Sequence, residues 1–459
     1  MTDSVDSTRH ADLIREAALR ASAYIEGRSA RAVIPTHEAI AALDGFTAVL
    51  GDDPVDARTI LDQLDRLGSP ATVVNTAGRY FGFVTGGTEP VAAAAAVLAG
   101  TWDQNIALPV MSPVAAHLDA IAARWVVDLL GLPVTSAASF CAGASIANLS
   151  GLLAGRDALL QRMLWSVDQR GLAGAPTLRV VASAEAHVSV FKALRAIGIG
   201  KDNIELAPTD HAGRVDASQL PRIDERTLVV LQAGNVNTGH SDPFDDIVPF
   251  ANAAGAWVHI DGAFGLWAAA SPRRRAQVSG AAAADSWATD AHKWLNAPYD
   301  SGIVIFARAA DARRAFAVEA AYLTTDSERA LMHLGLQMSQ RARGIETWAA
   351  IAARGRSGIA DLVDTACDHA TRLANLLVAG GVEIMAPVVL NQTLVSFGDD
   401  ATTDAVINAV QHDGTCWAGG TTWHGRRAMR LSVSDRATTT ADITMSAAAI
   451  LRCRDAIRG

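Results

Sequence analysis

Residues 256–295 read AWVHIDGAFGLWAAASPRRRAQVSGAAAADSWATDAHKWL, and this stretch decides the fold. Two apolar runs in it, Ala256–Ile260 and Ser286–Ala288, have the length and composition of buried strands. A charged residue follows each run, because Asp261 comes directly after the first and Lys293 shortly after the second. Charged groups just beyond buried strands are typical of a ligand site in an α/β protein.

The same alternation of short apolar runs and helices extends to both sides of this stretch. Further strands are expected at Ser136–Phe140, Leu178–Ala182, Thr227–Leu231 and Ile303–Phe306. The helices expected between the strands include Ser145–Leu160, Val188–Ile197 and Pro243–Ala253. This pattern favours an α/β fold with a mainly parallel, doubly wound sheet that is covered on both faces.

The two ends of the chain follow a different pattern. Apolar residues at helical spacing in Ala11–Leu19 and Thr59–Leu67 predict an N-terminal helical segment over residues 1–75. The large α/β domain is expected over residues 76–344. Residues 345–459 are expected to form a smaller C-terminal α+β domain with long Ala-rich helices. Its strands are expected at Val382–Met385, Thr393–Phe397 and Met429–Val433.

The composition argues against several classes of protein. Half of the 459 residues are hydrophobic, which excludes wholesale disorder. With 39 Lys and Arg against 48 Asp and Glu, the net charge of −9 argues against binding to nucleic acid. The longest run of small apolar residues, Val91–Gly100, is about half of the ~20 residues that a membrane span needs. The four cysteines are scattered without a CxxC pair and the N-terminal residues are polar, so we expect a cytoplasmic protein with reduced thiols and no metal.

A turn of small residues follows the expected strand at 136–140 and opens directly into a helix. Its residues run from Cys141 to Ser145 and include Gly143 and Ala144. Small residues let backbone N–H groups approach an anion, the helix N-terminus attracts negative charge, and Ser145 adds a hydroxyl group. Taken alone, the pattern is more typical of an ordinary N-cap serine on a tight turn.

Three more candidate groups follow three other strands of the same sheet. They are His187, Asp261 and the pair formed by His292 and Lys293. A lone histidine or lysine is most often a satisfied or surface residue, so each signal is weak by itself. Together with the anion site they match pyridoxal 5′-phosphate, which has a phosphate, a flat ring, a pyridine nitrogen that needs a carboxylate, and an aldehyde for a lysine.

Four motifs then make the chain similar to a known family. Gly143–Ser145, Ala186–Val190, His259–Gly265 and Asp285–Leu295 resemble the group II pyridoxal-phosphate-dependent amino-acid decarboxylases. Aromatic-L-amino-acid, glutamate and cysteine-sulfinate decarboxylases belong to that family. The resemblance implies the type I pyridoxal-phosphate fold, which is aspartate aminotransferase-like, with a seven-stranded sheet. It also implies a homodimer whose active site lies at the interface.

The resemblance implies a reaction and a role for three of the candidate residues. Lys293 is expected to hold the cofactor as a Schiff base, Asp261 to pair with the pyridine nitrogen, and His187 to stack on the ring. The expected reaction converts an L-amino acid to its amine with loss of CO2. Oxidation to an aldehyde, or a C–C lyase or aldolase reaction on the same fold, remains an alternative.

The resemblance implies that the phosphate of the cofactor binds at the start of the helix expected over Ser145–Leu160. Ala144 and Ser145 are expected to hold the phosphate, and His292 to contact it or to transfer a proton. The chain departs from the family pattern at Asp290, because the family often has an asparagine three residues before the lysine.

The loop expected after the lysine also departs from the family. In the family this loop carries a tyrosine that protonates Cα, whereas here the only tyrosine of the stretch is Tyr322, at its start. His333 is then the candidate acid, because its ordinary pKa of about 6.5 suits proton donation. An ordinary solvated histidine is equally compatible with the pattern. Slow protonation would favour the aldehyde product.

Single motifs in the sequence also suggest two unrelated functions. Ser145, Asp261 and His292 follow the order of an α/β-hydrolase triad, but Ala147 stands where the nucleophile motif needs its last glycine. The run Gly198–Lys201 hints at a nucleotide-binding loop, but no Ser or Thr follows its lysine. Neither alternative explains the whole set of residues.

Overall fold

A computed structural model describes residues 2–46, 49–318 and 330–459. Its centre is a seven-stranded sheet in the order β1-β7-β6-β5-β4-β2-β3. The strands are β1 (Ala137–Cys141), β2 (Arg179–Ser183), β3 (Ile204–Ala207), β4 (Thr227–Gln232), β5 (Trp257–Asp261), β6 (Ser286–Asp290) and β7 (Gly302–Phe306). Strands β2 to β6 pair in parallel, and β7 is antiparallel to β1 and β6. The mainly parallel sheet is therefore confirmed.

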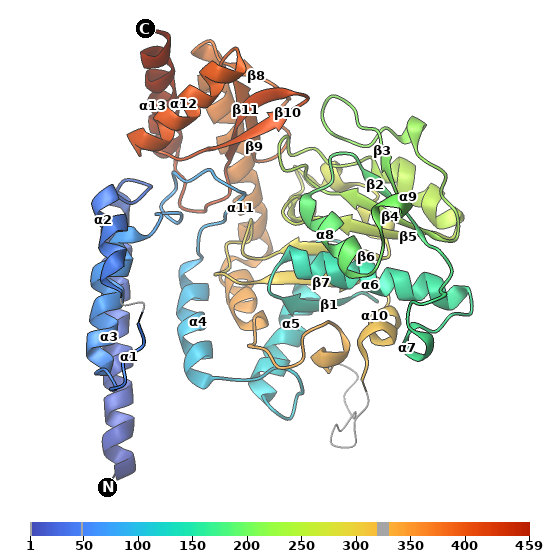
Figure 1. Cartoon of the computed structure of the whole chain (residues 1–459), viewed down its shortest axis with the longest axis horizontal. Coiled ribbons are helices and arrows are strands. Elements are labelled where there is room, and N and C mark those ends of the chain that lie inside the picture. The colour runs from blue at the N-terminus through green and yellow to red at the C-terminus, as the bar shows by residue number, and fades with distance from the viewer. Residues whose placement is uncertain (1, 47–48, 319–329) are drawn as a thin grey trace.

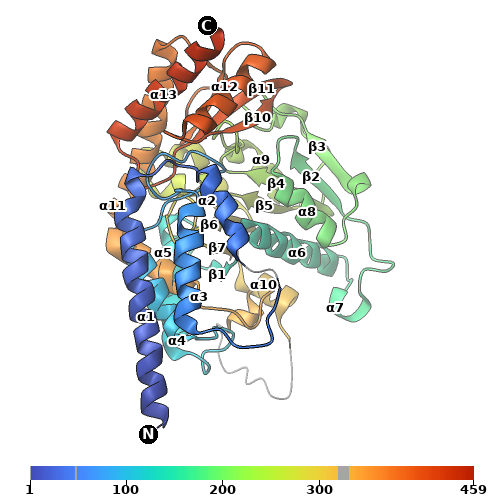
Figure 2. The same ribbon diagram turned by 60° about the vertical axis from the view of Figure 1, so that its left-hand side comes forward.

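Helices cover both faces of the large sheet (Figures 1 and 2). One core contains residues of α6 (Ala144–Arg162), α8 (Val188–Ala196) and α10 (Ala309–Phe316). The other contains residues of α5 (Pro113–Leu129), α9 (Phe244–Ala253) and α11 (Gly344–Ala379). Neighbouring strand residues go to opposite cores, as the two-residue period of a strand requires: Leu228 joins the first core and Val229 the second. This double burial explains why the strands are uninterrupted apolar runs.

A second sheet lies in the C-terminal third and is drawn in orange and red in Figure 1. Its order is β10-β11-β9-β8, and its pairs are antiparallel. The strands are β8 (Glu383–Ile384), β9 (Gln392–Ser396), β10 (Gly419–Trp423) and β11 (Arg426–Ser432). The helices α12 (Asp400–Asp413) and α13 (Thr440–Arg458) pack against each other beside it, and α11 connects it to the large sheet.

The N-terminal helices run along one side of the molecule (Figures 1 and 2). They are α1 (Thr2–Gly27), α2 (His37–Ala41) and α3 (Ala57–Gln63), and α4 (Pro90–Trp102) follows them and packs against α11. In the part of the chain that the structure describes, no helix combines the length and the apolar character needed to cross a membrane. All four cysteines are free and buried.

The structure differs from the predicted helices and strands at one helix boundary and at two short strands. Helix α1 is much longer than the predicted Ala11–Leu19, because no glycine or proline interrupts the chain before Gly27. Strand β3 is a short edge strand with exposed Glu205 and Leu206, so it lacks an apolar run. Strand β10 begins with two glycines and forms by pairing with β11. Every strand that the sequence predicts is present.

Candidate active site

One cavity of about 390 Å³ lies where the loops after β1, β2, β4, β5 and β6 meet. These strands end at the same edge of the sheet, which is where ligands bind in open α/β folds. All six residues predicted for the site line this cavity: Ala144, Ser145, His187, Asp261, His292 and Lys293. Gly234 and Val236, in the loop after β4, line it too.

The cavity includes the N-terminus of α6. The helix is capped by Gly143, which has no side chain to satisfy the first N–H groups. The Ala144 N–H instead donates to Asp290 Oδ1 over 2.6 Å, and Asp290 is only 2% exposed. The Ser145 side chain is exposed beside it. The anion-binding end of α6 therefore already holds an internal carboxylate.

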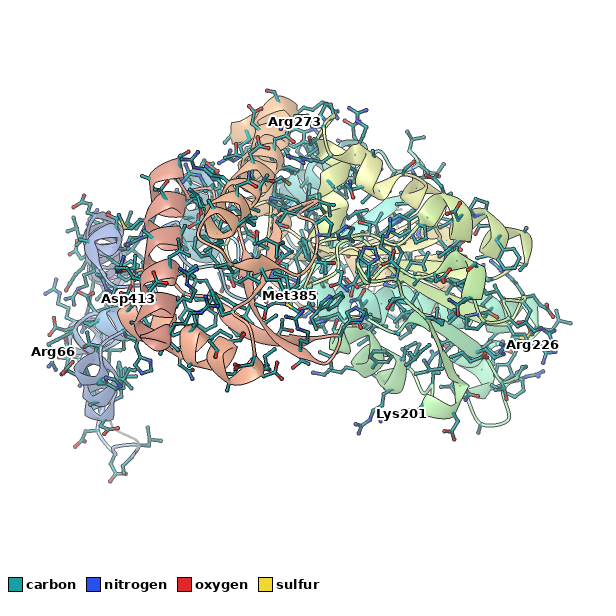
Figure 3. All side chains as sticks on the ribbon, turned by 90° about the horizontal axis from the view of Figure 1, so that it is seen from above. Arg66, Lys201, Arg226, Arg273, Met385 and Asp413 are labelled. Carbon is teal, nitrogen blue, oxygen red and sulfur yellow. The ribbon has the colours of Figure 1, made fainter. Side chains whose placement is uncertain are left out.

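Lys293 lies in the turn that follows β6. Its Nζ is 3.2 Å from Asp290 Oδ2, and its side chain is 20% exposed. The chain has three lysines, and the other two, Lys192 and Lys201, are exposed on α8 and just before β3. Lys201 points outward at the periphery of the molecule (Figure 3). Lys293 is thus the lysine that the fold brings to the cavity.

His292 is held by both of its ring nitrogens. Its Nδ1 accepts a hydrogen bond from the Ser301 N–H over 3.1 Å, and its Nε2 lies 3.6 Å from Asp290 Oδ2. The ring of Tyr299 lies 4.3 Å from the imidazole, centre to centre. Burial lowers the pKa of His292. Because Nδ1 is an acceptor, a neutral ring carries its proton on Nε2 and directs it toward Asp290.

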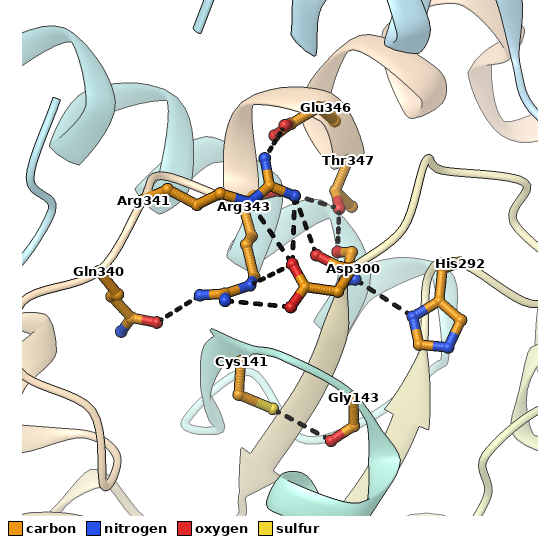
Figure 4. A network of polar contacts seen from close by, with 10 residues as sticks. Cys141, Gly143, His292, Asp300, Gln340, Arg341, Arg343, Glu346 and Thr347 are labelled. Atoms are coloured by element: carbon orange, nitrogen blue, oxygen red, sulfur yellow. Dashed lines mark hydrogen bonds and ion pairs between the residues drawn. The ribbon is translucent and has the colours of Figure 1, made fainter. Parts of the chain in front are cut away.

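A polar network anchors the loop that holds His292 (Figure 4). Asp300 accepts hydrogen bonds from Arg341 and from Arg343, and Arg343 is buried. The next residue, Ser301, meets the Thr347 hydroxyl over 3.1 Å. These contacts tie the loop to the start of α11 and so keep the Ser301 N–H on the imidazole.

Asp261 ends β5 and is 4% exposed. Its Oδ2 accepts from Asn148 Nδ2 over 3.0 Å, and its Oδ1 accepts from the Ala263 N–H over 3.2 Å. Burial raises the pKa of Asp261, while the nearby charges of Lys293 and His187 and the Asn148 hydrogen bond act to lower it. The carboxylate is therefore buried, oriented and surrounded by groups that favour its charged form.

His187 caps the N-terminus of α8. Its Nδ1 accepts from the Ser189 N–H over 3.3 Å and lies 2.8 Å from the Ser189 hydroxyl. Burial lowers the pKa of His187, which favours the neutral ring, although the charge of Asp261 opposes this. Since Nδ1 is an acceptor, the neutral ring carries its proton on Nε2, where the proton is free to meet a ligand.

The structure does not assemble the alternative serine-hydrolase site. The His292 imidazole is engaged by Ser301 and Asp290, and among the described residues Ser145 has no recorded hydrogen bond to a histidine. Tyr322, at the start of the loop expected after the lysine, lies outside the described residues. His333 lies in a short 3₁₀ helix and is absent from the residues that line the cavity.

Sequence reasoning missed several residues of the site. Asn148 lies one turn after Ser145 on α6, and this helical spacing is a signal that could have found it. Phe83 and Tyr299 also line the cavity. No local motif marks those two, because the loops that carry them reach the cavity only through the folding of the whole chain.

A family model described as the pyridoxal-dependent decarboxylase conserved domain matches residues 50–398, which is most of the chain. The chain belongs to this family. The predicted family is therefore confirmed, and the cofactor of the family is pyridoxal phosphate.

The curated relatives of this decarboxylase family member are distant and diverse. It is 25% identical over 332 residues to an aromatic-L-amino-acid decarboxylase of Bacillus atrophaeus. The matched region covers 68% of this chain and 65% of the relative. It is 25% identical over 302 residues to the acidic amino acid decarboxylase GADL1 of Mus musculus, with 63% and 54% covered. It is 26% identical over 299 residues to an L-2,4-diaminobutyrate decarboxylase of Acinetobacter baumannii, with 60% and 56% covered. The chain thus spans about half to two thirds of the length of these relatives.

Solved structures show the fold of this decarboxylase family member. A TDC of Oryza sativa crystallised with PLP and tryptamine superposes with a TM-score of 0.90 at 19% identity, covering 99% of both chains. Mouse CSAD superposes with a TM-score of 0.87 at 20% identity, covering 98% of this chain and 99% of that one. The predicted type I fold is confirmed.

The residues of the cavity fit pyridoxal phosphate. A lysine amine, a buried carboxylate, an imidazole and a helix N-terminus give one protein group for each part of the cofactor. One contact in the structure competes with binding of the phosphate. The Asp290 carboxylate already occupies the Ala144 N–H, so a phosphate that uses this N–H must displace it.

Proposed function

We propose that the protein decarboxylates an L-amino acid to its amine, with pyridoxal phosphate bound at Lys293. The observation that supports this most directly is the meeting of Lys293, Asp261 and His187 in one cavity beside the N-terminus of α6. When bound, the cofactor supplies a protonated pyridine ring that withdraws the electron pair of the Cα–carboxylate bond. The protein residues hold the reactants and control the protons.

Lys293 and Asp261 have the two central roles in this proposal. Lys293 would hold the cofactor covalently through its amine. Asp261 keeps a proton on the pyridine nitrogen, because a buried carboxylate stabilises a neighbouring cation strongly. The Asn148 and Ala263 N–H groups orient this carboxylate.

The remaining predicted residues bind the cofactor around its edge. The N–H groups of Ala144 and Ser145 and the Ser145 hydroxyl would hold the phosphate at the helix N-terminus. His187 would lie against the cofactor ring, with its Nε2 proton available to the carboxylate of the substrate. His292 contacts the phosphate or passes a proton through Nε2.

We infer that the substrate has an uncharged, apolar or aromatic side chain. Apolar residues contribute much of the cavity wall: Phe83, Val84, Ile146, Val236 and Phe264. Among the charged side chains in the wall, Asp261 and Lys293 are assigned to the cofactor, and Asp290 pairs with Lys293 and the Ala144 N–H. Phe83 stacks on Trp417 at 5.5 Å, which extends an aromatic surface beyond the cavity.

We also propose that the protein is a homodimer with the active site at the interface. Exposed apolar side chains on α4 support this, since Val97, Leu98 and Trp102 are unusual on a free helix surface. One chain has a mass of 48.0 kDa, and light scattering after size-exclusion chromatography should give twice that mass. A mass equal to one chain at assay concentration, with full activity, would contradict the proposal.

The test of the proposed function uses Lys293→Ala. The holoenzyme should retain cofactor after borohydride reduction, and mass spectrometry should locate it on Lys293. Lys192→Ala and Lys201→Ala are matched controls, because these are the other two lysines of the chain and they are exposed. A reduced adduct that persists in Lys293→Ala would overturn the assignment.

The substrate is tested by measuring CO2 release. A screen of the twenty amino acids, diaminobutyrate and sulfinates should show the highest kcat/KM for an amino acid with an uncharged, apolar or aromatic side chain. A preference for glutamate, aspartate or a sulfinate would refute the inference about the side chain. It would leave the assignment of Lys293 intact.

A further inference from the structure

A chain of four hydrogen bonds runs through the protein interior and ends on Asp261. Trp257 Nε1 donates to Ser286 Oγ over 3.0 Å, and Ser286 Oγ lies 2.8 Å from His259 Nδ1. His259 Nε2 lies 2.9 Å from Asn148 Oδ1, and Asn148 Nδ2 donates to Asp261 Oδ2 over 3.0 Å. The four side chains that lead to Asp261 are completely buried.

The chemistry of its two ends fixes the direction of this chain. The Trp257 indole can only donate, so Ser286 Oγ accepts from it; the Ser286 proton goes to His259 Nδ1 because the other end of the chain requires the ring proton of His259 on Nε2. At the other end, a charged Asp261 can only accept, so Asn148 must direct its NH2 to it and its oxygen to His259. His259 then carries its proton on Nε2. Every donor points toward Asp261, and aligned hydrogen bonds polarise one another.

The packing of α6 on β5 is shaped around this chain. Trp257, His259 and Asp261 alternate along β5, so their side chains share the face that α6 covers. A Cβ at Gly151 of α6 would lie 2.5 Å from His259 Cε1, and one at Gly155 would lie 2.6 Å from Trp257 Cδ1. Any side chain at either position would displace a member of the chain.

Asn148 is also connected, through Ser189, to His187, the residue expected to stack on the cofactor ring. Its NH2 group has two protons, and Nδ2 lies 3.5 Å from Ser189 Oγ as well as 3.0 Å from Asp261. Ser189 Oγ in turn lies 2.8 Å from His187 Nδ1. A single buried amide therefore contacts both the carboxylate below the cofactor site and the hydroxyl that sets the proton position of His187.

We propose that Asn148 is a positioning residue that couples Asp261 to His187, and that the Trp257–Ser286–His259 chain holds it in its working orientation. This rests on the proposed function, because it assumes that Asp261 and His187 contact the cofactor. With Asn148 in place, Asp261 is kept as an oriented acceptor for the pyridine nitrogen. The His187 proton is kept on Nε2, toward the cavity.

The first experiment replaces Asn148 by leucine, which has a similar shape and no polar atoms. We expect kcat of the holoenzyme to fall at least about tenfold, the scale of one hydrogen bond to a charged group. We also expect the pH midpoint of the absorbance of bound pyridoxal phosphate to move by about one unit. That midpoint responds to Asp261, and also to the charges of Lys293, His187 and Asp290 around it. Ser150→Ala is the matched control, since Ser150 is also buried on α6 and its hydroxyl donates to the Ile146 carbonyl of the same helix.

The second experiment uses Trp257→Phe, which keeps an aromatic side chain at this position and removes the N–H at the far end of the chain together with the five-membered ring that carries it. Trp257 is four residues from Asp261 along β5, about 13 Å at ~3.3 Å per residue. A coupled chain predicts a smaller shift of the absorbance midpoint, together with a loss of about twofold in kcat. A merely structural role predicts no shift at this distance. If Asn148→Leu does not fold, this variant decides alone.

The outcomes separate this inference from the proposed function. If wild type binds the cofactor covalently and both variants keep its midpoint and turnover, the coupling is refuted while the function stands. If wild type does not bind the cofactor at Lys293, the function falls and the coupling falls with it. If the midpoint moves in both variants and stays in Ser150→Ala, the coupling is supported.

Discussion

Asp290→Asn should bind pyridoxal phosphate more tightly than the wild-type chain. In the structure the Asp290 carboxylate accepts the Ala144 N–H over 2.6 Å and lies 3.2 Å from Lys293 Nζ. A phosphate that binds the N-terminus of α6 competes for this N–H, and the cofactor competes for the same lysine. Asparagine has almost the same shape but no charge, so it should be displaced more easily.

The magnitude follows from the contact that is given up. A hydrogen bond to a charged group contributes about 1.5–3 kcal/mol, and one between neutral groups about 0.5–1.5 kcal/mol. The difference of about 1–1.5 kcal/mol corresponds to roughly tenfold in the dissociation constant. Release of Lys293 from the ion pair and loss of repulsion between carboxylate and phosphate act in the same direction, so tenfold is the minimum.

The assay is an equilibrium titration of cofactor-free protein with pyridoxal phosphate, followed by absorbance in a buffer without phosphate. Inorganic phosphate should also compete more strongly with the cofactor in Asp290→Asn. Asp311→Asn is a suitable control, because Asp311 is a buried carboxylate in the first turn of α10 whose partners are Arg308 and Arg314, outside the cavity. A folded Asp290→Asn that binds the cofactor with equal or weaker affinity would refute the reasoning.

Three further predictions concern the groups behind and around the cofactor. Asp261→Asn should lower kcat at least about 10²-fold, the scale of losing one strong electrostatic stabiliser, while the adduct on Lys293 is retained; turnover near the wild-type value would contradict the pairing with the pyridine nitrogen. Burial lowers the pKa of His259 to about 3, so the unfolded chain, with its ordinary histidine pKa of about 6.5, binds more protons between these values. The free energy of unfolding should therefore fall as the pH drops from about 6.5 toward 3, by up to about 1.4 kcal/mol per pH unit, and urea titrations of His259→Gln should show a shallower fall; equal slopes would show that His259 is not the cause. Product analysis under air and under argon should show more aldehyde in Tyr299→Phe than in His333→Phe, because Tyr299 lines the cavity and His333 does not; clean amine from both variants without oxygen uptake would exclude both as proton donors.

The sheet and the residues at its edge were predictable because their signals are local. A strand buried on both faces must be an apolar run, and the loop after each parallel strand must emerge at the same edge of the sheet. The order of the expected strands, together with Ser145, His187, Asp261 and Lys293 at their ends, therefore implied one site before any coordinates. The same set of groups already matched pyridoxal phosphate, and the resemblance to a family added an expected role for each residue.

Other features depend on contacts between distant segments, which no local pattern carries. Asp290 stands where the family often has an asparagine, and the structure places its carboxylate on the N–H of Ala144, 146 positions earlier in the chain. Asn148 and His259 look like ordinary core residues until α6 packs on β5 and their buried polar atoms have to find partners. The sequence by itself determined the sheet, the order of the loops and the types of group they carry, because these follow from period and burial. The tertiary structure decided which of those groups touch, because a hydrogen bond needs its atoms within about 3 Å and only packing sets such distances.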